Sequence, residues 1–244
     1  MTNSDFEISS SDSAYEIKWE GDFAPASLRE KTAVEEFWAT AAAASSGKLR
    51  NDPLLTMSHF ASDGTTTRIK AKRTQYMHYY AAWRNPALGI VLESVAVSGV
   101  ILMGDASLLV ARRGEKVSHY PGCFEFTPSG GIDGLAMKAD GSVDFKGQLI
   151  REFEEETGIG KDAIVAIEPF SMIHDKPGRV YDICSLMRIS EGSSSIIPRL
   201  QTGEEYSEFA AVPIVNIRDF IAENEFIPTA ESMVEILFRG RMIC

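Results

Sequence analysis

The sequence predicts an α/β protein in which helices cover a mixed β-sheet, with a smaller α+β extension at the N-terminus. Segments of strand and helix periodicity mix without strict β-α alternation, which argues against a purely parallel sheet. A hydrophobic content of 44% and a charged content of 24% are typical of a soluble globular chain. The 244 residues are enough for a core domain with a smaller companion. We place the boundary near residue 93, with residues 1–93 as the extension and residues 94–244 as the larger domain.

In the extension, residues 1–12 are acidic and Ser-rich and are expected to be frayed. Beyond them, apolar residues recur first at strand and then at helix spacing. The expected elements are a strand at 14–21, a helix at 25–45, strands at 54–61 and 65–73 joined through Ser62-Asp63-Gly64, and a short helix at 74–83 closed by Asn85-Pro86.

After Pro86 the sequence becomes richer in apolar strand-like runs. The Gly104-Asp105 pair predicts a tight turn between the first two of them. The expected elements are strands at 94–103 and 107–114, a strand running into a glycine pair at 123–131, a helix at 144–158, a hairpin around 176–178, a strand near 209–214, and helices at 215–223 and 229–239.

The net charge of −11 is unevenly distributed. Residues 1–93 carry 10 basic against 12 acidic side chains, and residues 94–244 carry 14 against 23, so the larger part holds −9. Such a surface repels a phosphate backbone, which argues against a nucleic acid partner. It also repels a small phosphorylated substrate unless cations stand between them.

Two further features of the chain concern its location. No apolar run is long enough to cross a bilayer, and the N-terminus lacks the basic and apolar stretches of a signal peptide. The three cysteines are widely spaced and odd in number, which disfavours a disulfide framework or a zinc site. These observations predict a cytoplasmic protein with no membrane partner.

The segment REFEEETGIG at residues 151–160 concentrates carboxylates. On a helix Glu152, Glu155 and Glu156 stand at i, i+3 and i+4 and share one face, where like charges destabilise by about 0.2–0.5 kcal/mol per pair. Arg151 can reach Glu155 but cannot neutralise three anions. Oxygen ligands without nearby His or Cys select Mg²⁺ or Mn²⁺ over Zn²⁺. Gly158 fits a helix C-cap.

A solvent-facing acidic helix is the simpler alternative for this segment. The preceding TPSGGID favours a metal site instead, because a strand that ends in two glycines lets backbone carbonyls approach an ion.

The segment resembles the signature of the MutT/Nudix hydrolases, a glycine, five residues, a glutamate, seven residues and then R-E-U-x-E-E-x-G-U, where U is bulky and apolar. Residues 151–159 match the second half at every specified position. YPGCFEFTPSGGID and the strands before it also resemble the family, over roughly residues 94–244. The resemblance implies a Nudix-type α/β/α sandwich.

The first half of the signature departs from the family. Val143 stands where the family usually has glutamate, Asp144 is next to it, and the loop GLAMKADGSV is longer than usual. Either the loop bulges and Asp144 substitutes, or one supporting carboxylate is missing.

The resemblance implies Mg²⁺- or Mn²⁺-dependent hydrolysis of a nucleoside diphosphate linked to another group. It implies that Glu152, Glu155 and Glu156 bind metal, that the carbonyl of Gly130 is a further ligand, and that Arg151 holds a glutamate in place. The extension of some 90 residues favours a nucleoside diphosphate sugar, of the UDP-sugar or ADP-ribose type, by analogy within the family.

The general base is expected in the loop before a late strand, where QTGEEYSEF supplies Glu204, Glu205 and Glu208. A charged loop without chemistry is the alternative. Glu125 alternates with Phe124 and Phe126, so it faces the other side of its strand and is a candidate for assisting substrate or metal, or is simply a paired strand residue.

Several basic residues are candidates for substrate contact. Arg68 heads a row with Lys70 and Lys72 on one strand face, for which a solvated edge strand is the simpler explanation. Arg112 and Arg113 follow a strand, where charged residues are common.

The remaining candidates are aromatic side chains and histidines. A helical stripe of Tyr76, Tyr79, Tyr80 and Trp83 is expected to pack between the two parts of the chain, with base stacking as the alternative. The four histidines share no metal-ligand spacing and are expected to be structural, although His174-Asp175 could line a pocket mouth.

Two other function classes stay open at this point. Val143 in place of glutamate keeps open a catalytically weak or inactive Nudix domain that binds nucleotide as a regulatory module. A structural or partner-binding domain with a solvated acidic helix is the other. A homodimer is compatible with the sequence but nothing in it requires one.

Overall fold

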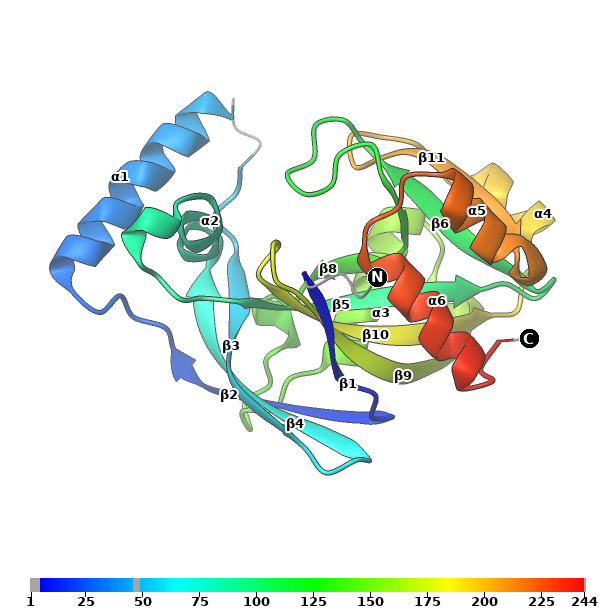
Figure 1. Ribbon diagram of the computed structural model, residues 1–244, viewed down its shortest axis with the longest axis horizontal. Helices are drawn as coiled ribbons and strands as arrows, with labels where there is room; N and C mark the ends of the chain where they lie inside the picture. The colour runs from blue at the N-terminus through cyan, green and yellow to red at the C-terminus, as the bar shows by residue number, and fades with distance from the viewer. Residues whose placement is uncertain (1–4, 46–48, 244) are drawn as a thin grey trace.

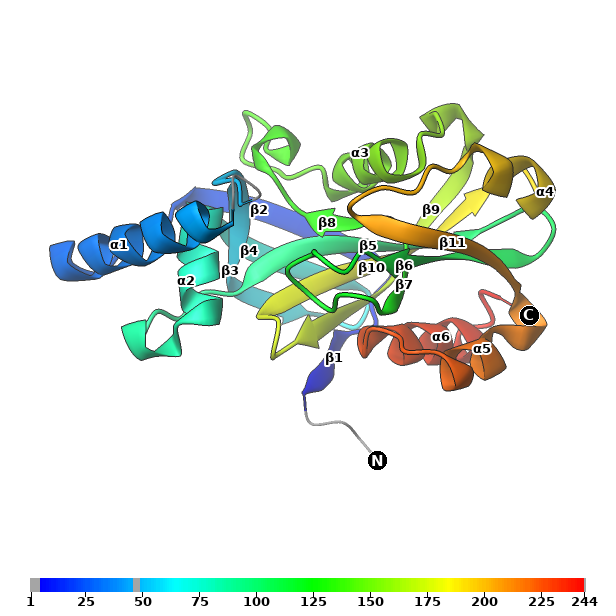
Figure 2. The same cartoon turned by 90° about the horizontal axis from the view of Figure 1, so that it is seen from above.

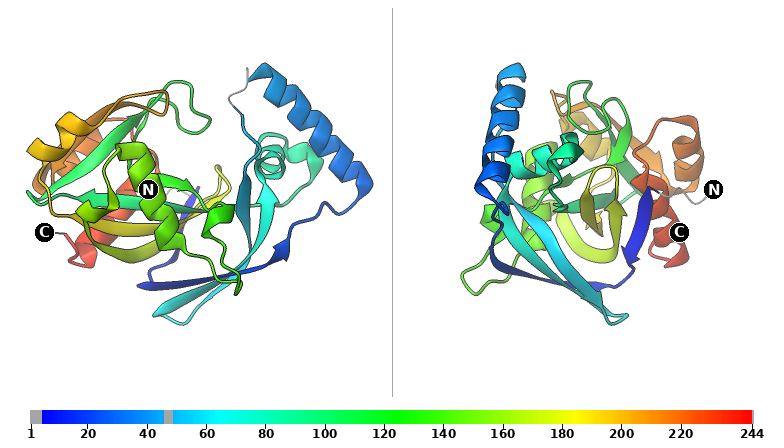
Figure 3. Two further views of the ribbon diagram at one scale, coloured as in Figure 1. Left: turned by 180° about the vertical axis from the view of Figure 1, so that it is seen from behind. Right: turned by 60° about the vertical axis from the view of Figure 1, so that its left-hand side comes forward.

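The computed structural model describes residues 5–45 and 49–243 and places a mixed β-sheet between helices. Helix α3 lies on one face of the sheet and helices α5 and α6 lie on the other (Figures 1 and 2). Helices α1 and α2 gather at the far end of the sheet, as the view from behind shows (Figure 3). The mixed α/β fold with helices on both faces is therefore confirmed.

The strands of the described residues join into one eleven-stranded sheet. Its main path runs in the order β1-β9-β10-β5-β3-β4-β2, while β8 pairs with β5, and β6 carries both β7 and β11. The pairs β5–β10 and β2–β4 are parallel and the others are antiparallel. The strands are β1 (Phe6–Ser10), β2 (Ala14–Asp22), β3 (Pro53–Ser62), β4 (Thr66–Gln75), β5 (Ser94–Leu102), β6 (Ser107–Arg113), β7 (Phe124–Phe126), β8 (Ser129–Gly131), β9 (Ile164–Asp175), β10 (Val180–Ile189) and β11 (Tyr206–Pro213).

The helices lie where apolar residues recur at helical spacing. They are α1 (Leu28–Ala44), α2 (Tyr76–Arg84), α3 (Phe145–Thr157), α4 (Ser193–Ile196), α5 (Ile217–Glu223) and α6 (Thr229–Arg239). Leu149 and Phe153 of α3 are fully buried in a cluster that includes Val95 and Val97 of β5. Burying each such side chain stabilises the fold by roughly 1.5–3 kcal/mol.

A second apolar cluster lies on the other face of the sheet. It joins Leu237 of α6 to Val100 of β5 and to Phe124 and Phe126 of β7. Successive residues of β5 point to opposite faces, so the strand contributes to both clusters and is buried along almost its whole length. This buried strand fixes the positions of both helix layers.

Residues 6–10 form a strand, so the expectation of a frayed segment over residues 1–12 is wrong there; residues 1–4 lie outside the described residues. Strand β1 pairs with β9, and the hydroxyl of Ser171 donates to the carbonyl of Ser10 at 3.0 Å. The short polar sequence gives little local signal, and the partner strand supplies the hydrogen bonds that order it.

The two parts of the chain share one sheet. Strand β1 adds to β9, and Thr56 of β3 pairs with Ser94 of β5 across the expected boundary near residue 93. That boundary stays a prediction.

The aromatic stripe of α2 packs in two directions. The Tyr79 hydroxyl donates to the Gly178 carbonyl at 2.5 Å, and the Trp83 ring stacks on His119 with centroids 3.7 Å apart. Tyr76 and Tyr80 instead pack against Trp38 of α1. Packing between the two parts is thus confirmed for Tyr79 and Trp83.

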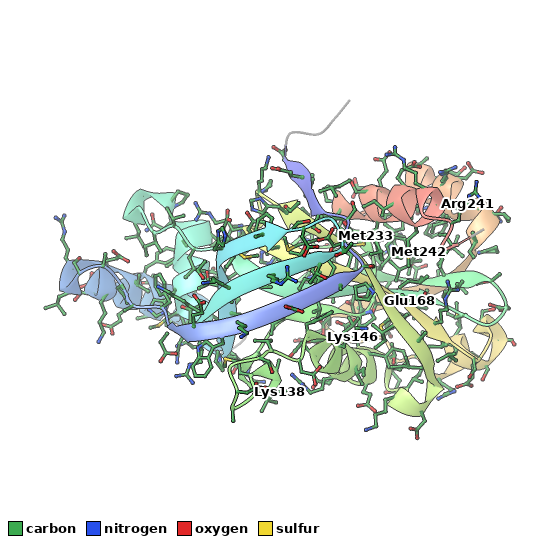
Figure 4. The ribbon with its side chains drawn as sticks, turned by 90° about the horizontal axis from the view of Figure 1, so that it is seen from below. Lys138, Lys146, Glu168, Met233, Arg241 and Met242 are labelled. Carbon is green, nitrogen blue, oxygen red and sulfur yellow. The ribbon has the colours of Figure 1, made fainter. Side chains whose placement is uncertain are left out.

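The long loop before α3 is held by charged side chains, seen from below in Figure 4. Lys138 in the loop forms an ion pair of 3.2 Å with Asp144, and Lys146 in the first turn of α3 donates to the Ile167 carbonyl of β9 at 3.1 Å. These contacts fix the start of α3. No helix in the described part of the chain is both long and apolar enough to span a membrane.

Candidate active site

Helix α3 begins and ends at residues suited to each end. The Asp144 carboxylate accepts a hydrogen bond of 3.0 Å from the Gly147 amide and so caps the N-terminus. Gly158 at the C-terminus has φ +67°, a left-handed conformation that glycine adopts without strain. Leu149 and Phe153 are buried against the sheet, Glu154 and Glu155 are exposed, and Glu152 and Glu156 are half-buried.

Glu152 lies directly against the glycine pair of β8. A Cβ atom on Gly130 would come within 2.3 Å of the Glu152 carboxyl carbon, so only glycine fits there without displacing the carboxylate. The Gln148 side chain donates to Glu152 Oε1 at 2.6 Å and holds it in this position. The predicted ligands Gly130 and Glu152 are therefore brought together.

Glu156 is held by Thr127 just before β8, by Ser129 of β8 and by Tyr206 of β11. It accepts hydrogen bonds from the Thr127 hydroxyl and from the Ser129 amide, the latter at 3.0 Å. The Tyr206 hydroxyl lies 3.0 Å from Glu156 and 3.0 Å from Glu125, so it links these two carboxyl groups. Nothing in the sequence marked Tyr206 except its position beside Glu205.

Glu152, Glu155 and Glu156 form the glutamate cluster of α3, and two of its carboxyl groups lie in an unfavourable environment. Burial, with the neighbouring Glu155 and Glu205, raises the pKa of Glu152 to about 7. Burial also raises the pKa of Glu156 well above its ordinary value. Glu152, Glu155 and Glu156 have no ion-pair partner among the described residues, because the nearby cations are taken by other carboxylates.

Arg151 pairs differently from the expectation. It was expected to reach Glu155 and hold a glutamate, but its guanidinium forms an ion pair of 3.0 Å with Asp133 and also donates to Gln148. Because Gln148 in turn holds Glu152, Arg151 acts on the cluster through this amide. Asp133, two residues after the glycine pair, was missed because its partner lies 18 residues away.

The departure at Val143 and Asp144 is also explained. Val143 is buried in the apolar core, and its amide donates to the Ile17 carbonyl of β2. Asp144 caps α3 and pairs with Lys138. Asp144 is thus already bound at the helix start, which argues against its replacing the missing glutamate.

The three candidate bases before β11 lie in different places. Glu205 lines both the cavity beside Gly130 and a neighbouring hollow near α1, whereas Glu204 lines that hollow but not the cavity. Glu208 pairs with Arg112 at 3.0 Å. A bulge in β11 sets Tyr206 opposite Arg113 and Glu208 opposite Arg112, so Tyr206 and Glu208 point to opposite faces.

Of the three candidate arginines, one lines the cavity and the other two lie elsewhere. Arg113 lines the cavity and forms an ion pair with the buried Glu125. Arg112 stacks over the Phe124 ring on the other face, at 4.1 Å from its centroid. Arg68 lies on β4, paired with Asp63 at 2.8 Å, and is not among the residues that line the cavity.

Glu125 faces away from Phe124 and Phe126, as its alternation with them predicted. Both phenylalanines lie in the second apolar cluster, whereas Glu125 contacts Arg113 and Tyr206. Burial raises the pKa of Glu125, and the guanidinium of Arg113 opposes that rise.

The cavity beside the cluster has a volume of about 510 Å³. Gly130, Asp133 and Glu205 line the end next to α3, and Asp175 and Asp182 of the β9–β10 hairpin line another part. Tyr79 of α2 contributes to its wall, so residues of the extension complete it. The size suits a drug-sized or nucleotide-sized ligand.

The donor set suits a hard divalent cation. Carboxylate oxygens of Glu152, Glu155 and Glu156 and the carbonyl of Gly130 are the ligand type that Mg²⁺ and Mn²⁺ prefer. Within the described ranges, no three His, Cys, Asp or Glu side chains form a cluster already arranged to hold a metal. Metal binding therefore requires the glutamate side chains to turn toward one another.

Comparison with known proteins gives structural likenesses only. No family model matches the sequence, and no curated protein matches it. The chain is similar in structure to the NUDIX domain of Shewanella oneidensis NrtR complexed with ADP ribose, with 16% identity over 67% of this chain and 96% of that one and a TM-score of 0.46.

Two other solved structures are similar to a comparable extent. The MutT protein from Methanosarcina mazei Go1 shows 19% identity over 61% of this chain and 95% of that one, with a TM-score of 0.41. A bifunctional NMN adenylyltransferase/ADP ribose pyrophosphatase from Francisella tularensis, complexed with AMP and a Mn ion, shows 18% identity over 66% of this chain and 46% of that one, with a TM-score of 0.45.

Proposed function

We propose that this chain is a Nudix-type hydrolase that uses Mg²⁺ or Mn²⁺ to cleave the diphosphate bond of a nucleoside diphosphate linked to another group, with a nucleoside diphosphate sugar as the favoured class. The observation that supports it best is that Glu152 lies against Gly130, with Glu155 and Glu156 on the same helix, next to a cavity of about 510 Å³ that Gly130 lines. Mutually repelling carboxylates without ion-pair partners in the described chain are stabilised by a bound cation.

Glu152, Glu155, Glu156 and the Gly130 carbonyl are the proposed metal ligands. A divalent ion held there would mask phosphate charge and lower the pKa of a bound water. This answers the electrostatic difficulty of an anionic substrate in a part of the chain that carries −9.

Arg113 and Arg151 have separate proposed roles. Arg113 is the candidate arginine that lines the cavity, where it offers a positive charge to the diphosphate while it pairs with Glu125. Arg151 orients Glu152 through Gln148.

Glu205 is the proposed general base. Of the three candidates before β11, it is the one that lines the cavity, and its burial raises its pKa toward a useful range. Glu208 is held by Arg112 on the other face. We also propose that the protein acts in the cytoplasm and binds neither nucleic acid nor membrane. A homodimer stays a prediction.

The test is hydrolysis of a panel of nucleoside diphosphate conjugates in Mg²⁺, with product analysis. We expect two phosphorylated products and a loss of activity of about 100-fold or more in Glu155→Gln, because changes beside metal ligands alone cost ~10–100-fold. Glu154→Gln is the matched control, since Glu154 binds the Lys161 amide at the end of α3 instead.

Two outcomes would contradict this proposal. Tight nucleotide binding by calorimetry without turnover would favour the regulatory binding module. Equal behaviour of wild type and Glu155→Gln, with no thermal shift in Mg²⁺ and nucleotide, would favour a structural domain.

A further inference from the structure

The cavity continues beyond the glycine pair along the sheet. In the strand register Gly131 of β8 pairs with Ala96 of β5, and Ala96 pairs with Asp182 of β10. All three residues line the cavity. Since neighbouring strands lie about 4.8 Å apart, Asp182 is about 10 Å from Gly131 across the sheet.

Small side chains keep this part of the cavity open. Ser94, Ala96 and Ser98 alternate along the cavity side of β5, where larger residues would fill the space. Two positions further along the same face, Val100 is fully buried in the second apolar cluster. The change from small to large residues marks where the open site ends and the packed core begins.

Asp182 has hydrogen-bonding capacity that the protein does not use. The Ser98 hydroxyl donates to its Oδ1 at 3.0 Å, and this is the one side-chain hydrogen bond to the carboxyl found in the described chain. No ion pair to Asp182 is found there either. Burial raises the pKa of Asp182 to about 7, as expected for a carboxyl that lacks a compensating partner.

The nearby Asp175 shows the contrast. It accepts hydrogen bonds from the Tyr120 hydroxyl and the Gly178 amide, both at 2.9 Å, and so holds the turn between β9 and β10. Its partners are supplied by the fold. Asp182 differs from Asp175 in that its second carboxyl oxygen accepts no hydrogen bond from the described residues and is open to a ligand.

We propose that Asp182, supported by Ser98, determines which linked group the site accepts, by receiving hydrogen bonds from the hydroxyls of a sugar attached to the diphosphate. This inference rests on the proposed hydrolase function. A carboxylate oxygen accepts from hydroxyl donors and repels phosphate, so Asp182 meets the uncharged, hydroxyl-bearing part of the substrate. Its distance from the glycine pair matches that arrangement, with the diphosphate next to the glutamate cluster and the sugar across β5.

The experiment compares two substrates that differ only in the linked group. One is a nucleoside diphosphate hexose and the other is the same nucleoside diphosphate esterified to methanol. For Asp182→Ala and Asp182→Asn we expect kcat/KM on the hexose conjugate to fall by about 10–100-fold, mostly through KM, because hydrogen bonds to charged groups are lost. Activity on the methyl ester should stay within about 2-fold. Asp162→Asn, an exposed carboxylate outside the cavity, is the control.

A second variant and a binding measurement keep the result interpretable. Ser98→Ala should lower kcat/KM on the hexose conjugate selectively, and by less than the Asp182 variants do. It replaces the Asp182 variants in the test if thermal melting shows that they do not fold. Calorimetry of the full chain with each conjugate in Mg²⁺ measures the same selectivity without turnover.

The possible failures are distinct. Equal effects of Asp182→Ala on both conjugates, or none on either, overturn the assignment of Asp182 while leaving the hydrolase proposal intact. A third conjugate, the same nucleoside diphosphate linked to an aminoalkyl group, tests for a cationic ligand. If Asp182→Ala loses activity on that conjugate and keeps it on the hexose, the assignment is overturned in favour of a cationic group. A wild type that cleaves neither conjugate contradicts the hydrolase proposal. If calorimetry then shows equal affinity for the two conjugates, the assignment of Asp182 is overturned as well.

Discussion

Adding one methyl group at Gly130 should disrupt metal binding, whereas the same change at Gly131 should not. The added Cβ in Gly130→Ala would lie 2.3 Å from the Glu152 carboxyl, where ordinary contact begins at 3.4 Å, so the carboxylate must retreat by about 1.1 Å. At Gly131 the Cβ meets nothing within 4 Å, and neither glycine has a positive φ. The two variants therefore differ in contact with Glu152 and not in backbone strain.

We expect Gly130→Ala to weaken Mn²⁺ binding by about 10–100-fold, the range found when groups that orient metal ligands are changed. That corresponds to about 1.4–2.7 kcal/mol. Gly131→Ala should bind Mn²⁺ like the wild type. Isothermal titration calorimetry with Mn²⁺ measures both, and thermal melting checks that both variants are folded.

Equal Mn²⁺ affinities for the two variants would refute the reasoning. In that case Glu152 would be positioned by Gln148 alone, and its approach to Gly130 would have no part in binding a cation. Weak binding in both variants and in the wild type would argue against any metal site here.

Two further predictions concern Asp144 at the start of α3 and Asp182 in the cavity. Asp144→Ala should destabilise the fold by about 1 kcal/mol and lower Tm by about 2–4 °C, because it removes the helix cap. Asp144→Asn should keep the cap, and both variants should keep hydrolase activity. A loss of activity in Asp144→Asn with unchanged Tm would instead give Asp144 a role in the site. Burial raises the pKa of Asp182 to about 7 from its ordinary value of 3.8, so the folded state holds its proton over a range where the unfolded state has released it. Stability should therefore fall as pH rises from about 4 to 7, and Asp182→Asn should remove this part of the slope in denaturant titrations. An unchanged slope would show that other buried carboxyls account for it.

Local sequence determined α3 and its carboxylates. Helical spacing put Leu149 and Phe153 in the core and Glu152, Glu155 and Glu156 on other sides of the helix, and both caps lie within one turn of the helix ends. The alternation of Glu125 with two phenylalanines likewise set its face. These features depend on residues a few positions apart, which is the range over which periodicity and capping act.

Tertiary structure decided which of the similar candidates lie at the cavity. The bulge in β11 separates Tyr206 from Glu208, and simple alternation would have placed both on one face. The pairing of β8, β5 and β10 brings Asp182 into register with Gly131, although 51 positions separate them along the chain. Strand register and bulges are set by contacts between distant segments, so no local pattern in the sequence could reveal them.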